Sequence, residues 1–187
     1  HEAAVKVGVG YMISAIVAVD KDWGIGYQGQ LLEHIPEDLK HFKELTKYNV
    51  VVMGRNTWES LPKRDSLPRL PDRINIIVSN SIVSNGVISI LGDLTVAMPL
   101  EDTLDYICGS DLVCDTDIFV IGGGQIYNAL LPYCNRVYVT KIDKSHDNID
   151  TFFPNLDETG EWEAIEDGPM ASYNNVNYQF WHYDRIS

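Results

Sequence analysis

Short apolar runs separated by helical patterns constrain the fold of this 187-residue chain more than any other feature. Four of these runs are rich in β-branched residues and almost wholly apolar, which is typical of strands covered on both faces of a sheet. They lie at Ile13–Val19, Val50–Met53, Ile74–Val78 and Ile118–Ile121. The runs therefore predict the buried strands of a central sheet.

Helical patterns alternate with the strands in the early part of the chain, whereas the late part shows consecutive strands with no helix between them. Pro36 suits the first position of a helix, and Glu37 and Asp38 complement the positive end of the helix dipole. This first helix is predicted over 36–47, and a second is predicted to begin near Arg55. Two further helices are predicted, over Leu100–Ile107 and from Gly124 or Gln125 to Leu131. Late strands are expected at Arg136–Ile142, Trp162–Ile165 and Val176–Tyr183. This order predicts an α/β fold whose mixed central sheet is mostly parallel, with antiparallel C-terminal strands and flanking helices.

The length of the chain suits one domain, which should bury about 70% of its unfolded surface. Residues 1–11 begin with His and precede Met12, so we expect a leader added for expression there, a native extension being the alternative. The domain itself is expected over 12–187. Stretches 62–72 and 79–86 are expected to be irregular loops because of their Pro, Asn, Ser and Gly content.

The composition of the chain excludes several classes of partner and of site. With 14 basic and 27 acidic residues, the net charge is −13, which argues against a general nucleic-acid or anionic-membrane binder. No apolar run approaches the ~20 residues that span a membrane. Cys108, Cys114 and Cys134 form no CxxC motif, and the five histidines show no paired ligand spacing. We therefore expect free thiols in a reducing, cytoplasmic compartment and no metal site.

The sharpest local motif is a glycine-rich turn between an apolar strand and a predicted helix. It reads Ile121-Gly122-Gly123-Gly124-Gln125-Ile126-Tyr127. Glycines let a phosphate approach the backbone, and the N-terminus of a helix offers free N–H donors. Alone the motif is weak, because Tyr127 replaces the last glycine of GxGxxG and too little chain follows for a dinucleotide-binding fold. A tight structural turn is the alternative.

A second turn of this kind follows the strand that ends at Met53. Gly54 permits close approach, Arg55 can pair with a phosphate, and the Thr57 hydroxyl can donate to it. Together the two turns would form opposite walls of one anion-binding cleft. The alternative is that Arg55 is a solvated charge and Thr57 caps the helix.

One carboxylate lies on an apolar helix face. Asp38 precedes Phe42 by four residues and Leu45 by seven, so it shares their face, to which Leu39 also belongs. Desolvation there raises the pKa of an unpaired acid, which can bind a cationic or amidine-like donor edge or assist proton transfer. The alternative is compensation of the helix dipole, which Glu37 already supplies.

Taken together, these segments resemble dihydrofolate reductase, in order and across essentially all of 12–187. The resemblance rests on the strand and turn over 13–26, the helix start Ile35-Pro36-Glu37-Asp38, and the turn Val52–Ser60. It continues through Pro71–Ser79, the glycine turn at 121–127, Tyr138-Val139-Thr140 and Asp150–Pro154. The resemblance implies a single domain of that fold.

The resemblance also implies a substrate site for the pterin, aminobenzoyl and glutamate parts of dihydrofolate. Asp38, the catalytic residue, would bind the 2-amino group and N3 of the pterin, supported by the Thr140 hydroxyl. Arg73 would form a two-pronged pair with the α-carboxylate of the glutamate tail, a geometry that Lys does not reproduce. Apolar contacts would come from Ile16, Phe42, Leu61, Leu70 and Ile121.

For the cofactor NADPH, the resemblance implies three groups of contacts. Phosphates of the adenosine half would meet Arg55, Asn56, Thr57, Ser79 and Asn80. The pyrophosphate would meet the turn formed by Gly122, Gly123, Gly124, Gln125, Ile126 and Tyr127, with a cis peptide bond between Gly122 and Gly123. The nicotinamide side would touch Ala18, Ile25 and Gly26.

The implied reaction is hydride transfer from NADPH to C6 of 7,8-dihydrofolate, with protonation of N5, in support of one-carbon metabolism and thymidylate synthesis. A water would deliver the proton, because N5 lies too far from the expected Asp38 position. We expect a monomer, and antifolates are possible ligands. Rival hypotheses are a reductase of this fold acting on another pterin-like or flavin-precursor heterocycle, and a nucleotide-binding module without catalysis.

Three departures from the family pattern stand out. Glu33 occupies the position of a usual Trp, so we expect an altered pH dependence and antifolate affinity. Lys63, Arg64 and Arg69 add positive charge to a lengthened loop near the expected glutamate tail, although a solvated insertion is the alternative. Gln125 stands where a basic residue often lies, which leaves Arg55 to recognise the 2′-phosphate.

Overall fold

The structure is a computed structural model that describes residues 12–82, 88–92, 94–109 and 116–186. The chain forms two compact units. The middle unit contains Leu45–Tyr133, and the terminal unit combines Ser14–Glu44 with Cys134–Ser187. The expected leader over 1–11, Cys114 and part of the predicted loop at 79–86 lie outside the described residues.

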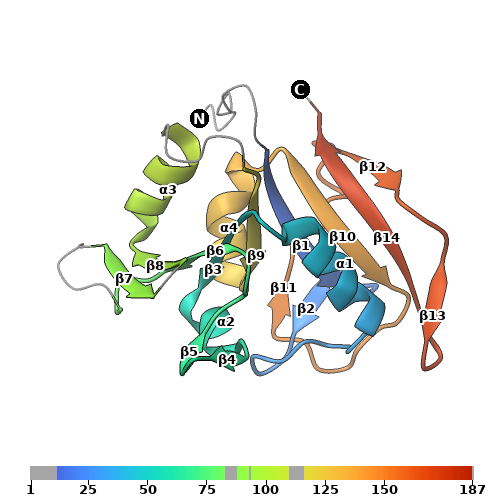
Figure 1. Ribbon diagram of the computed structural model, residues 1–187. Coiled ribbons are helices and arrows are strands. Elements are labelled where there is room, and N and C mark those ends of the chain that lie inside the picture. The colour runs from blue at the N-terminus through green and yellow to red at the C-terminus, as the bar shows by residue number, and fades with distance from the viewer. Residues whose placement is uncertain (1–11, 83–87, 93, 110–115, 187) are drawn as a thin grey trace. The chain divides into compact units, whose positions relative to one another are not determined.

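Parallel strands form the body of the middle unit (Figure 1). Their spatial order is β9 (Ile118–Gly122), β3 (Val50–Gly54), β6 (Ile74–Val78) and β8 (Thr95–Met98), and β7 (Ser89–Gly92) pairs antiparallel with β8. Residues 50–53 are all buried, as the apolar run predicts for a strand covered on both faces. The helices of this unit are α2 (Arg55–Ser60), α3 (Leu100–Gly109) and α4 (Gly124–Leu130), which runs into the 3₁₀ turn Leu131–Tyr133.

The predicted irregular loop at 62–72 contains a short hairpin, so that prediction was wrong in part. Strands β4 (Lys63–Arg64) and β5 (Leu67–Pro68) pair antiparallel across Asp65 and Ser66. Both turn residues have positive φ, at 53° and 67°, as a two-residue turn that matches the twist of its strands requires. The strands β7 and β8 went unpredicted because runs of four residues show no clear periodicity.

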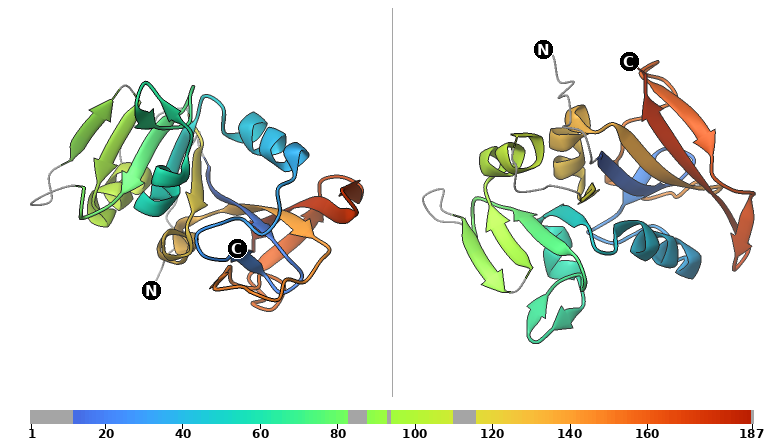
Figure 2. Two further views of the ribbon diagram at one scale, coloured as in Figure 1. Left: turned by 90° about the horizontal axis from the view of Figure 1, so that it is seen from below. Right: turned by 45° about the horizontal axis from the view of Figure 1, so that its top comes forward.

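The terminal unit holds one parallel strand pair and all of the late antiparallel strands. β1 (Ile13–Val19) pairs parallel with β10 (Arg136–Ile142), and β14 (Val176–Arg185) runs antiparallel to β10. The strands β12 (Trp162–Glu166) and β13 (Ala171–Tyr173) both pair with β14, as the red strands of Figure 2 show. A separate small sheet joins β2 (Gly24–Gly26) to β11 (Thr151–Phe152). The expected α/β fold with a mostly parallel sheet and antiparallel C-terminal strands is confirmed.

Helix α1 (Pro36–Thr46) carries the predicted acidic first turn but does not bury its apolar face. Thr46 is the buried residue of this helix, whereas Leu39 remains 46% exposed and Phe42 is half-buried. Leu39, on the predicted apolar face, is therefore not part of the core. An apolar side chain left exposed beside Asp38 is surface that an apolar ligand could cover.

Candidate active site

The predicted acid of the terminal unit lies next to its predicted hydroxyl partner. Asp38, in the first turn of α1, accepts a 2.5 Å hydrogen bond at Oδ1 from the Thr140 hydroxyl of β10. Burial raises the pKa of Asp38, while the Thr140 bond and the neighbouring His41 oppose that rise. This acid is therefore partly desolvated, held in one orientation, and bonded through only one of its carboxylate oxygens in the contacts described.

Strand register places further predicted residues beside this pair. Ala18 of β1 lies opposite Thr140, and Ile16 lies opposite Tyr138 on the same face of β1. Both Ile16 and Ala18 are half-buried, unlike the buried Ala15 and Val17 between and before them. Ile25 and Gly26 lie on β2, in the small β2–β11 sheet of the same unit.

A buried cluster that the sequence did not single out supports this region of the terminal unit. Ile35, directly before α1, packs with Ile142 and Tyr178, and Phe180 packs against that group. Phe180 also stacks on His41 of α1, with ring centroids 4.1 Å apart. These contacts fix α1 on the sheet and so fix Asp38. The alternating apolar positions of β14 were the available signal.

In the middle unit, the two glycine turns are neighbours because their strands are neighbours. Strand β3 pairs with β9, and Met53 lies opposite Gly122. Ile121 is the extra residue of a bulge at this point, since Val52 lies opposite Val120. A Cβ on Gly54 would lie 3.0 Å from the Ile126 side chain, and one on Gly123 would lie 3.8 Å from the Thr57 hydroxyl. The two glycine turns therefore lie next to each other in the structure.

Gly122 cannot be replaced without strain. Its φ is +118°, and a Cβ there would lie 3.2 Å from the buried ring of Tyr127. The peptide bond to Gly123 is cis, as the resemblance implied. Gly123 precedes α4 as its N-cap, and no side chain caps that helix. The first backbone N–H groups of α4 therefore lie at the turn, and the Tyr127 ring packs against Gly122.

Arg55 is linked to Ser79 through Ser81, for which the sequence predicted no role. The guanidinium donates to Glu59 Oε1 and to Ser81 Oγ, both at 2.8 Å, and Ser81 Oγ lies 3.1 Å from Ser79 Oγ. Ser79 Oγ also accepts backbone N–H groups of Ser81 and Ile82. Asn56 and Asn80 are exposed beside these residues. The repeated serine in Ser79-Asn80-Ser81 was the signal for Ser81.

Arg73 is 5% exposed, yet its described hydrogen bonds are to neutral groups. It donates to the Pro71 carbonyl at 2.8 Å and to the Thr46 hydroxyl at 3.1 Å, and no carboxylate pairs with it among the described residues. Burial lowers the pKa of this guanidinium, and Asp72 opposes the effect. A buried cation held by neutral groups favours an external anion as its partner.

Asn75, for which the sequence predicted no role, holds Leu70 and Arg73 in place. Its amide donates to the carbonyls of Leu70 and Arg73, at 2.9 and 3.0 Å, and its oxygen accepts the N–H of Leu70. Nearby, Trp58 Nε1 donates to the Pro68 carbonyl, which ties α2 to β5. Leu61, at the end of α2, is half-buried like Leu70.

Comparison with known proteins identifies the family of the chain. A family model described as dihydrofolate reductase matches residues 12–185. The chain belongs to the dihydrofolate reductase family. It is 37% identical over 176 residues to the dihydrofolate reductase of Bacillus subtilis, a match that covers 93% of this chain and 95% of that protein.

Two further relatives show how the family varies in length. The dihydrofolate reductase of Mycobacterium leprae is 36% identical over 165 residues, 86% of this chain and 90% of that protein. The bifunctional dihydrofolate reductase-thymidylate synthase of Daucus carota is 34% identical over 181 residues, 91% of this chain but 33% of its own length. Membership of this family makes the chain an oxidoreductase that uses a nicotinamide cofactor.

A hollow in the terminal unit lies on the face of β10 opposite to the Thr140 side chain. Its volume is about 270 Å³, and Trp23, Lys141 and Trp181 contribute to its lining. Lys141 follows Thr140 on β10, so their side chains point to opposite faces of the sheet. The Lys141 ammonium lies 4.3 Å from the Trp181 ring centroid and 5.1 Å from that of Tyr183. The Lys141 ammonium therefore occupies this aromatic corner of the hollow.

Over the described ranges, every helix is too short or too polar to cross a bilayer.

Proposed function

We propose that this chain catalyses the NADPH-dependent reduction of 7,8-dihydrofolate to 5,6,7,8-tetrahydrofolate, with a hydride added at C6 and a proton at N5. The observation that carries the proposal is the placement of Asp38. A desolvated carboxylate, oriented by Thr140 and flanked by the exposed apolar side chain of Leu39, suits a flat heterocycle with an edge of N–H donors.

Arg73 supports folate over other heterocycles. A buried guanidinium whose described partners are neutral can form a charge-assisted, two-pronged pair with the α-carboxylate of a glutamate tail. A pterin or a flavin precursor without that tail has no use for such an arginine. The rival reductase hypothesis is therefore the weaker one.

The glycine turn fits the pyrophosphate of a dinucleotide. Gly122 and Gly123 leave backbone open where any Cβ would approach Tyr127 or Thr57, and Arg55 adds a positive charge at the neighbouring turn. When bound, NADPH supplies the hydride. The protein's own part is to orient both partners: Asp38 accepts from the pterin edge, Thr140 holds Asp38, and a water carries the proton to N5.

The direct test follows NADPH absorbance with the purified chain and 7,8-dihydrofolate. We expect oxidation that depends on dihydrofolate and stops when either reactant is absent. Binding of NADPH without oxidation would favour the nucleotide-binding module instead. Oxidation only with a tail-free pterin or a flavin precursor would favour the rival reductase.

Arg55 should decide the preference for NADPH over NADH. Replacing it with Gln removes the charge available to the 2′-phosphate, so we expect KM for NADPH to rise about tenfold while KM for NADH stays constant. Glu59→Gln is the matched control, because it frees Arg55 from its 2.8 Å ion pair and should lower KM for NADPH. Equal effects of Arg55→Gln on both cofactors would contradict this role.

The proposal extends to a monomer working in the cytoplasm. Cys108 is a free thiol, which suits a reducing compartment.

A further inference from the structure

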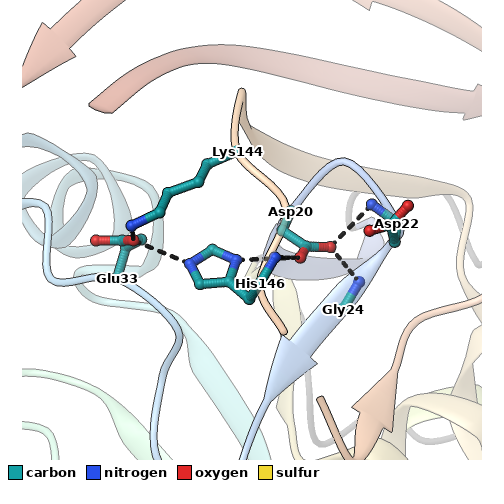
Figure 3. A network of polar contacts seen from close by, with 6 residues as sticks. All are labelled: Asp20, Asp22, Gly24, Glu33, Lys144 and His146. Atoms are coloured by element: carbon teal, nitrogen blue, oxygen red, sulfur yellow. Dashed lines mark hydrogen bonds and ion pairs between the residues drawn. The ribbon is translucent and has the colours of Figure 1, made fainter. Parts of the chain in front are cut away.

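A polar network joins three loops of the terminal unit around His146 (Figure 3). His146 Nδ1 lies 3.1 Å from Asp20 Oδ2, and its Nε2 lies 2.9 Å from Glu33 Oε1. Lys144 Nζ donates to the same Glu33 oxygen at 2.8 Å. Asp20 follows β1, Glu33 precedes α1, and the other two residues lie between β10 and β11. The imidazole therefore bridges two acids that are 13 residues apart in sequence.

The Asp20 end of the bridge is rigid. Its side chain is fully buried, and Oδ1 accepts the backbone N–H groups of Asp22 at 2.9 Å and Gly24 at 2.8 Å. Oδ2 also accepts the backbone N–H of His146 at 3.2 Å. Asp20 is thus committed to holding both loops, and its contact with the ring cannot be released without dismantling the turn that follows β1.

The Glu33 end is more accessible. The side chain of Glu33 is 19% exposed and that of Lys144 is 50% exposed. The bond from Lys144 lowers the pKa of Glu33, burial opposes this, and His146 lowers it further. Glu33 is therefore an anion at neutral pH, and protonation on the acid side would remove its attraction for the ring.

The protonation state of the ring decides how many contacts the bridge can make. A neutral imidazole carries one N–H, whereas the imidazolium carries two. Only the imidazolium can donate to Asp20 and Glu33 together. In the neutral ring, the proton stays on Nδ1 toward the fixed Asp20, and the Nε2 lone pair then faces a carboxylate. Loss of the second proton therefore removes the hydrogen bond from Nε2 to Glu33.

The other charged groups of these loops leave this assignment unchanged. Lys21 and Asp143 pair with each other at 3.3 Å. Asp22, His34 and Asp147 are exposed. The charges in direct contact with the ring are thus the two carboxylates that it bridges, and Lys144 shares the Glu33 oxygen that the ring contacts.

We propose that His146 is a pH-dependent clamp that fastens the segment carrying Glu33 to the turn at Asp20, and that it releases this segment when the imidazole loses its second proton. The clamp is closed while Glu33 is ionised and the ring is doubly protonated, and it opens when a rise in pH leaves the ring neutral. This clamp stands independently of the proposed function. Glu33 lies two residues before Ile35, whose buried side chain anchors the start of α1, so the free segment ends at the helix that carries Asp38.

The test is an NMR titration of the ¹⁵N-labelled full chain between pH 5 and 9. Side-chain ¹⁵N shifts of His146 report its ring protons, and backbone relaxation of residues 32–34 reports the motion of the segment. We expect both to change with one midpoint, the segment being ordered on the acid side. Constant relaxation across the His146 titration would overturn the proposal.

Two variants test the charge logic. In Glu33→Gln, the side-chain amide can satisfy the ring in either state, so we expect His146 to bind its second proton about tenfold more weakly and the relaxation of 32–34 to become independent of pH. In Lys144→Met, removal of the competing cation should strengthen proton binding by His146. A Glu33→Gln titration that overlays the wild type would show that the ring does not respond to Glu33, which also overturns the clamp.

Discussion

Replacing Asp38 with Asn should remove most turnover and leave the fold intact. Asn keeps the shape of the side chain and an oxygen that can accept the 2.5 Å bond from Thr140, but it carries no charge for the N–H edge of the pterin. Loss of a charge-assisted, orienting contact in the reacting complex is worth about 100-fold, so we expect kcat/KM at pH 7 to fall by about that factor.

The same substitution should not cost stability at neutral pH. Burial raises the pKa of Asp38, so the folded state holds this proton more tightly than the unfolded state does. The stability gained from that proton is complete below the unfolded pKa, about 3.9, and is lost as pH rises through the raised folded pKa. At pH 7 the ionised acid therefore weakens the fold, and Asn should match or exceed the wild type in free energy of unfolding.

Urea unfolding and initial rates across pH 5–8 check both halves of this prediction. Wild-type KM for dihydrofolate should rise as pH falls through the raised pKa of Asp38, because the protonated acid no longer accepts both N–H donors. The variant should lack that rise. Glu37→Gln is the matched control: it lies one residue earlier in the same helical turn and is exposed. Near-wild-type turnover in Asp38→Asn would remove Asp38 from the mechanism.

Replacing Arg73 with Lys should weaken substrate binding with little change in kcat. Lys keeps the positive charge, but its single ammonium lacks the planar fork that binds both oxygens of a carboxylate at once. Loss of one charge-assisted hydrogen bond predicts a rise in KM for dihydrofolate of about 10- to 100-fold. The chemistry at C6 lies at the other end of the substrate, so the rate at saturation should persist.

A truncated substrate separates this role from a structural one. Arg73 donates to Pro71 and Thr46, so Lys could also disturb the local fold. With a dihydropterin that lacks the glutamate tail, wild type and variant should show the same KM. Arg69→Lys is the matched control, because it makes the same change at an arginine that already pairs with a carboxylate, that of Asp65 at 3.2 Å. If Arg73→Lys impairs both substrates equally, the residue supports the fold rather than the tail.

Much of this architecture could be predicted from local patterns. Strand β1 and the start of α1 follow the residues that apolar runs and the Pro36 signal indicate. Such signals act within a dozen residues, and so they place elements well. They failed at β7 and β8, which are too short to carry a period, and in the β4–β5 hairpin, whose turn depends on positive φ at Asp65 and Ser66.

By itself, the sequence determined which residue types stand at the ends of strands and helices: an acid in the first turn of α1, glycines at the ends of β3 and β9, and an arginine before β6. Tertiary structure decided what each of them meets. Asp38 and Thr140 are 102 residues apart, the Arg73 guanidinium found neutral partners, and His146 came to lie between Asp20 and Glu33. These outcomes depend on which strands pair and which loops close, because burial over the whole chain, rather than local propensity, selects those contacts.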